Sequence, residues 1–250
     1  MDLHVTLLMY LYYYARPVVA VAVLALGIAI ICTKDRITKL LGIWTAIIGA
    51  GALYSSLYQL FIRYISVEVL AKLSIFNTFA SMILGIASGL VLFLYVNKRY
   101  GVKFYLGIIL IAGSQVLALL FRFLVSKLWE SGNIADITQF TFLINLSTLI
   151  PGLATEIIML VIFVKNKHKE KELKLLWLAA LRPVIDSSIY LVMYLFGFAS
   201  KDYYTFQDKT SAISLILGIS GIVISLLISI YILVKGRKAS EDDKLIIVEN

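Results

Sequence analysis

The sequence predicts an all-α membrane protein, a polytopic bundle of about seven transmembrane helices with its N-terminus outside the cell and its C-terminus in the cytoplasm. One observation is composition: 61% of the 250 residues are apolar and the mean hydropathy is +0.93, whereas soluble domains are about 45–50% apolar. These apolar residues also form long uninterrupted blocks. Finally, successive loops between the blocks alternate between many and few basic residues, which is the positive-inside pattern of membrane proteins.

Seven apolar blocks are long enough to cross a bilayer, which takes roughly 20 residues of helix. They cover residues 7–32, 40–62, 73–96, 104–124, 140–164, 175–199 and 212–234, and a short cytoplasmic tail follows at 235–250. Strands of a membrane barrel are excluded, because they alternate in polarity and are about half as long. No polar stretch is long enough to form a soluble domain, so we expect a single domain in the membrane.

The loops set the expected orientation. Fifteen Lys and Arg residues lie in the stretches 34–39, 98–103 and 165–174 and in the tail, whereas five lie in the stretches 63–72, 127–136 and 201–209. Short loops rich in Lys and Arg stay in the cytoplasm. Aromatic residues agree with this assignment, because tyrosines at 10–14 and Trp129 mark the expected outer interface.

Arg16 and Pro17 interrupt the first block. Arg16 precedes Lys34 by 18 residues, or about 27 Å of helix, which favours a position at the outer interface. Pro17 then fits the first helical position, where its missing N–H has no partner to lose. The segment before it is expected to be an interfacial helix or an extension of the span. The competing interpretation is a buried, functional Arg16.

Small and polar residues recur on single helical faces, as expected where helices pack closely in lipid. In the third span, Gly85 and Gly89 form a G-x-x-x-G motif that follows Asn77 on the same helix. The last span has the series Ser214, Gly218, Gly221 and Ser225, and the fifth has Asn145, Thr148, Gly152 and Thr155. We expect these faces to point inward and to bring helix backbones together.

Three ionisable residues lie well inside the spans, Glu156 in the fifth and Arg182 and Asp186 in the sixth. Each costs roughly 2.5–3.5 kcal/mol in hydrocarbon. Glu156 lies nine residues before Lys165 and Arg182 eight after Lys174, so they share a depth on consecutive antiparallel helices. Asp186 is one turn further on the face of Arg182. One guanidinium is therefore predicted to bridge both carboxylates.

This trio predicts either a site for a proton, a cation or a small polar solute, or a structural clamp between two helices. Weaker candidates for the same site are Asn145, Thr148, Asn77 and Arg16. The two histidines, His4 and His168, are not near the middle of any span, so neither haem nor a metal is expected. No catalytic residues and no cofactor are predicted. The basic residues lie in short loops rather than on a folded face, so nucleic acid is not an expected partner.

The lipid bilayer is an expected partner of this protein, and three functions stay open. The first is a transporter of a small solute, ion or proton that uses the trio. The second is a non-catalytic membrane subunit or sensor that works through a membrane protein partner or a second copy of itself. An intramembrane lipid-modifying enzyme is weakest, because the sequence pairs no nucleophile with a base.

Overall fold

The computed structural model describes residues 9–33, 35–61, 67–134, 137–170, 173–200 and 203–248, and every regular element in these ranges is a helix. A π-helical turn, η1 (Leu11–Ala15), leads directly into the first long helix, and a short 3-10 turn, η3 (Lys167–Lys169), follows the fifth. The long helices are α2 (Arg16–Ile31), α3 (Arg36–Phe61), α4 (Val67–Tyr100), α5 (Phe104–Glu130), α6 (Ile137–Asn166), α7 (Trp177–Ser200) and α8 (Tyr203–Val248).

The prediction of seven membrane-length helices is confirmed over the described residues. The qualifying segments are Leu11–Ile31, Arg36–Phe61, Phe79–Tyr100, Phe104–Glu130, Phe142–Lys169, Trp177–Phe196 and Ile213–Gly236. Each coincides with one predicted apolar block. Two helices are much longer than their blocks, because α4 begins at Val67 and α8 runs on to Val248. Hydropathy marks the membrane-spanning part of a helix, but polar residues can continue the same helix beyond it.

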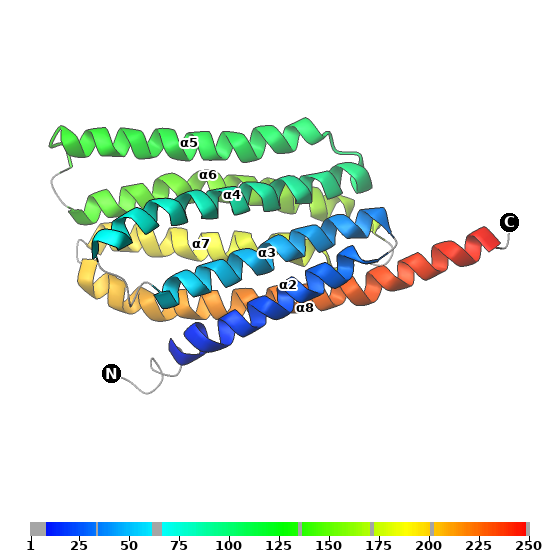
Figure 1. The fold of residues 1–250 in the computed structure, drawn as a ribbon. Helices are drawn as coiled ribbons and strands as arrows, with labels where there is room; N and C mark the ends of the chain where they lie inside the picture. The colour runs from blue at the N-terminus through cyan, green and yellow to red at the C-terminus, as the bar shows by residue number, and fades with distance from the viewer. Residues whose placement is uncertain are drawn as a thin grey trace.

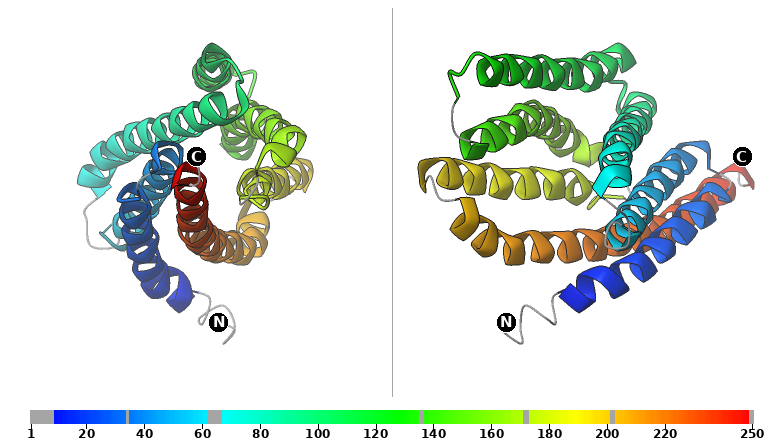
Figure 2. Two further views of the ribbon diagram at one scale, coloured as in Figure 1. Left: turned by 90° about the vertical axis from the view of Figure 1, so that its right-hand side faces the viewer. Right: turned by 60° about the vertical axis from the view of Figure 1, so that its left-hand side comes forward.

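The helices lie side by side, and the start of η1 and the end of α8 lie at opposite ends of the bundle (Figure 1). Each long helix packs on the next one in the chain, and α8 also packs on α2 and α3. This last contact closes the bundle into a ring, which is visible in the end-on view (Figure 2, left). The ring brings α2 against α8, although these two helices are the first and the last of the long helices along the chain.

The helix α5 lies at the edge of the bundle (Figure 2) and packs chiefly on α4 and α6. Apolar side chains such as Ile109, Val116 and Phe123 are exposed along it. A soluble protein rarely exposes a contiguous apolar face of this extent. Lipid tails would cover these side chains, so the exposed surface agrees with the membrane assignment.

The closest backbone contacts join α2 and α3. A β-carbon added at Gly27 would lie 2.7 Å from Cα of Ala46, and one added at Gly49 would lie 2.7 Å from Cα of Leu24. Only glycine fits at such crossings, which is how small residues hold membrane helices together. The sequence had pointed to the third and last spans for this role, so the structure places the tightest crossing elsewhere.

The predicted glycine pair in the third span is only half realised. Gly89 faces the side chain of Ile111 on α5, so a larger residue there would disturb the α4–α5 contact. Gly85 is exposed, and no described atom lies within 4 Å of the place where its β-carbon would be. The prediction that Gly85 packs against a neighbouring helix is therefore wrong, because α5 crosses α4 nearer to Gly89.

Candidate functional site

Arg182 and Asp186 form an ion pair on α7. They are four residues apart, on one face of the helix, and Nε of Arg182 lies 3.2 Å from Oδ2 of Asp186. The guanidinium also reaches α8, where its Nη1 donates a hydrogen bond of 3.0 Å to Oγ of Ser225. The side chains remain 29% and 22% exposed, respectively. This pair therefore ties α7 to α8 and is only partly buried.

The small residues of α8 make room for these polar side chains. The atoms nearest to Gly221 belong to the guanidinium of Arg182, and those nearest to Gly218 belong to the ring of Tyr12 on η1. Ser214, one turn earlier, is half-buried. This small-residue face points into the bundle, as predicted. The expected close approach of backbones is wrong for Gly218 and Gly221, because side chains of neighbouring helices fill the space that glycine leaves.

Glu156 lies on α6, opposite α7. It is half-buried, and its side chain is within hydrogen-bonding range of Ser187, the residue after Asp186. Its Oε2 atom is buried and has no hydrogen-bond partner among the described residues. Glu156 is also close enough to feel the charges of both Arg182 and Asp186. The shared depth predicted from the sequence therefore agrees with the structure.

The predicted direct bridge from Arg182 to Glu156 is wrong. Within the described parts of the chain, the ion pair of Arg182 is with Asp186, and none within 4.0 Å joins it to Glu156. The guanidinium has a carboxylate one turn away on its own helix, and Ser225 draws it toward α8. Both contacts turn it away from α6. Helix spacing fixes the depth of a side chain, but packing decides which way it points.

Arg16 is the fourth charge of the site. Its Nη1 donates a hydrogen bond of 2.7 Å to the hydroxyl of Tyr12, one helical turn earlier, and its Nε is buried without a partner among the described residues. Its charge acts on that of Arg182 on α7. Arg16 is therefore within electrostatic reach of the site, and we call Arg16, Glu156, Arg182 and Asp186 the charged cluster. The four formal charges cancel, whereas the trio alone carries one net negative charge.

The backbone before Arg16 forms a π-helical turn, and Pro17 explains why. The chain is helical through Pro17, and the turn just before α2 is the π-helical η1. Proline cannot donate to the helix ladder, and its ring clashes with the carbonyl four residues earlier. The wider π turn, with a bond from Arg16 N–H to the Leu11 carbonyl, relieves that clash. The segment before Pro17 is thus an extension of the span, one of the two expected outcomes.

The remaining candidate residues lie apart from the charged cluster. Thr148 is exposed on α6 and accepts a hydrogen bond of 3.0 Å from Nε of Arg122 on α5. Asn145 is half-buried on α6, and it precedes Glu156 by 11 residues, or about 16 Å along the helix. Asn77 is half-buried on α4, a helix that packs chiefly on α3 and α5. None of these three is placed at the site.

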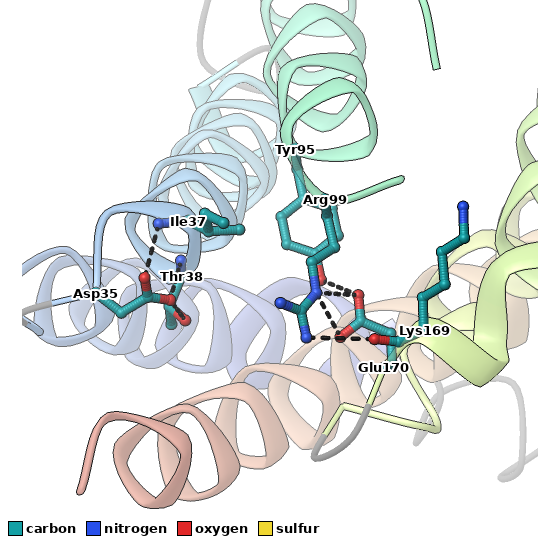
Figure 3. Close-up of polar contacts among 7 residues, drawn as sticks. All are labelled: Asp35, Ile37, Thr38, Tyr95, Arg99, Lys169 and Glu170. Atoms are coloured by element: carbon teal, nitrogen blue, oxygen red, sulfur yellow. Dashed lines mark hydrogen bonds and ion pairs between the residues drawn. The ribbon is translucent and has the colours of Figure 1, made fainter. Parts of the chain in front are cut away.

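A second polar site, which the sequence did not predict, surrounds the connection between α6 and α7 (Figure 3). Glu170, in the connection between α6 and α7, is only 3% exposed. Its Oε1 accepts a hydrogen bond of 2.5 Å from the hydroxyl of Tyr95, and both carboxylate oxygens lie 3.3 Å from Nε of Arg99. Arg99 also donates to the carbonyl of Lys169. We call Tyr95, Arg99 and Glu170 the loop clamp.

Asp35 begins α3 beside this clamp (Figure 3). Its carboxylate accepts hydrogen bonds from the N–H groups of Ile37 (3.1 Å) and Thr38 (2.8 Å) and from the Thr38 hydroxyl, the usual arrangement at a helix N-terminus. Burial raises the pKa of Asp35, but these hydrogen bonds and the positive charge of Arg99 together outweigh it, so the pKa lies below its ordinary value. The loop clamp thus joins the end of α4 to the α6–α7 connection, and the charge of Arg99 also acts on Asp35 in the α2–α3 connection.

The sequence held one weak signal for the loop clamp. Glu170 and Asp35 are acidic residues in loops where Lys and Arg outnumber Asp and Glu. Such a residue stands out in a region where positive charge is expected. Tyr95, the hydrogen-bond partner of Glu170, is 75 residues away in the sequence, so only the fold reveals the contact.

Comparison with protein-family models, with curated proteins and with solved structures found no match to this chain.

Proposed function

We propose that this protein lies in the cell membrane and moves a small polar solute, an ion or a proton through the charged cluster. The observation that carries the proposal is the incomplete pairing of these charges. Oε2 of Glu156 and Nε of Arg16 are buried without a partner in the described residues. A purely structural cluster would be expected to satisfy such groups, because each unpaired one costs free energy.

The location of the cluster supports the same proposal. Its residues come from three helices, α2, α6 and α7, and a fourth helix, α8, supplies Ser225. Ionisable residues within membrane spans commonly mark the path of an ion or a solute. Arg182 and Asp186 keep 29% and 22% exposure, so a ligand could reach them without the bundle coming apart. A pair of carboxylates beside two arginines suits a proton or a zwitterionic solute.

A second function rests on a different observation. A cavity beside Ser225 has a volume of only about 10 Å³, which is too small for any solute larger than water. Such tight packing beside Arg182 would fit a non-catalytic membrane subunit or sensor that acts through a partner or a second copy. In that case the charged cluster would orient α7 against α6 and α8.

Flux measurements in proteoliposomes separate the two functions. Purified protein would be reconstituted with a pH-sensitive dye inside the vesicles, and proton entry would be followed under an imposed membrane potential. We expect entry above that of protein-free vesicles, lost in Glu156→Gln and kept in the control Glu130→Gln, whose exposed side chain pairs with Lys127. Wild-type flux equal to that of empty vesicles for protons and for a panel of small zwitterions would refute transport. Capture of a stoichiometric partner from native membranes would then favour the second function.

We further propose that the end of the bundle carrying the loop clamp faces the cytoplasm, because the basic-rich stretches 34–39, 98–103 and 165–174 belong to the connections there. Single cysteines would be introduced on a background in which the exposed Cys32 is replaced. In intact cells, an impermeant thiol reagent should label positions in 201–209 and spare those in 165–174. The reverse pattern would invert the orientation.

A further inference from the structure

A small cavity lies where α2, α3 and α8 meet. It has a volume of about 10 Å³ and is lined by Val23, Trp44, Thr45, Ile48, Ser225 and Ser229. Three of these residues carry hydroxyl groups. Thr45 is 1% exposed and Ser229 2% exposed, so the cavity is deep inside the protein. Its size matches the space that one water molecule needs.

The hydroxyl groups around the cavity have unused hydrogen-bonding capacity. Oγ1 of Thr45 has no partner among the described residues. Ser225 donates its proton to the carbonyl of Gly221 and accepts from Arg182, which leaves one lone pair. Ser229 donates to the carbonyl of Ser225, which leaves both of its lone pairs. A hydroxyl group offers one donor and two acceptor sites, so one donor and several acceptors remain.

We propose that this cavity holds one ordered water molecule. The water accepts a hydrogen bond from the Thr45 hydroxyl and donates one to Ser225 and one to Ser229. Buried waters typically make about three such bonds, so the site satisfies the water and the water satisfies Thr45. A metal cation is a poor occupant, because hard cations take six or more oxygen ligands, commonly with carboxylates among them, and this cavity has three hydroxyls and no carboxylate.

This water extends the polar network beyond the charged cluster. It links Thr45 on α3, through Ser225 on α8, to Arg182 on α7. The link is structural and does not conduct protons, because the Ser225 proton is committed to the Gly221 carbonyl.

The substitution Thr45→Val tests the water through the sign of its effect. With water present, the variant loses a hydrogen bond and leaves the water short of partners, so Tm should fall by about 2–4 °C. With an empty cavity, the variant removes an unpaired hydroxyl and adds a methyl group, so Tm should rise. A rise or an unchanged Tm would overturn the proposal. The matched control is Ser56→Ala on the same helix, whose buried hydroxyl bonds only to the Ala52 carbonyl.

Two further measurements do not depend on that single variant. In the double variant Thr45→Val with Ser229→Ala, the loss in Tm should be smaller than the sum of the single losses, because both substitutions expel the same water. Additive losses would contradict a shared water. In an experimental map of the wild-type protein that shows other ordered waters, density should lie between these hydroxyls. A clear void there would also overturn the proposal.

Discussion

The charged cluster and the loop clamp contain similar polar groups but differ in how fully these groups are hydrogen-bonded. Both pair an arginine with a carboxylate, and in both a tyrosine hydroxyl bonds to a charged residue, Tyr12 to Arg16 and Tyr95 to Glu170. In the loop clamp, Glu170 is buried and receives hydrogen bonds from Tyr95 and Arg99. In the charged cluster, Glu156 has a buried oxygen with no partner among the described residues. A completed polar site is expected to stabilise the fold, whereas an incomplete one leaves capacity for a ligand or a proton.

The largest loss of stability is expected from Glu170→Ala. This change leaves the buried Tyr95 hydroxyl without its acceptor and Arg99 without its counter-charge, so the free energy of unfolding should fall by about 2–4 kcal/mol. Thermal unfolding in detergent would measure it. Glu130→Ala is the matched control, because Glu130 is 62% exposed and pairs only with Lys127; we expect a change within about 0.5 kcal/mol. Equal losses in both variants would show that the loop clamp contributes nothing special.

A double-mutant cycle then ranks the partners of Arg182. Arg182→Gln with Asp186→Asn should show a coupling energy within the range of about 0.5–3 kcal/mol seen for contacting residues. Arg182→Gln with Glu156→Gln should show a smaller coupling, because the structure has no direct ion pair between these two side chains. If the second coupling exceeds the first, the bridge predicted from the sequence would be restored.

A smaller effect is expected where α8 receives the guanidinium. Gly221→Ala places a methyl group against the side chain of Arg182, so stability should fall by about 1 kcal/mol as the guanidinium is displaced. Gly85→Ala serves as the control on α4, where the added methyl meets open space. There the better helix propensity of alanine should leave stability unchanged or raise it by up to about 1 kcal/mol. The same loss at both positions would mean that glycine itself, and not the guanidinium, matters at Gly221.

The smallest effect concerns pH. The pKa of Asp35 is lower in the folded protein than its ordinary value. At a pH above that ordinary pKa, the charged carboxylate therefore stabilises the fold. This contribution is lost as the pH falls through the pKa of the folded state. Asp35→Asn keeps a good helix cap but cannot titrate. The stability advantage of the wild type over Asp35→Asn should therefore shrink below a pH of about 4. If thermal stability followed parallel pH profiles in the wild type and in Asp35→Asn, the prediction would be contradicted.

Much of the fold was predictable, because bilayer thickness imposes one length on every span. The seven spans and the grouping of Glu156, Arg182 and Asp186 follow from hydropathy and helix geometry alone. The direction of the guanidinium was not predictable, because it depends on Ser225, on a helix that meets α7 only in the folded bundle. The crossing at Gly27 was missed for a related reason, since a pattern of small residues does not reveal which neighbour faces it.

The length of α8 has a mechanical consequence. The helix is unbroken from Tyr203 to Val248, and its last part projects past the other helices (Figure 1). At Gly236 the side chain of Thr38 on α3 still lies against α8, so the projecting part begins beyond this residue. Val248 lies 12 residues further on, which is about 18 Å along the axis. Because the helix is unbroken, a tilt of about 5° at Gly236 would move its end by about 1.6 Å, so the orientation of α8 in the bundle sets the position of the C-terminal end of the chain.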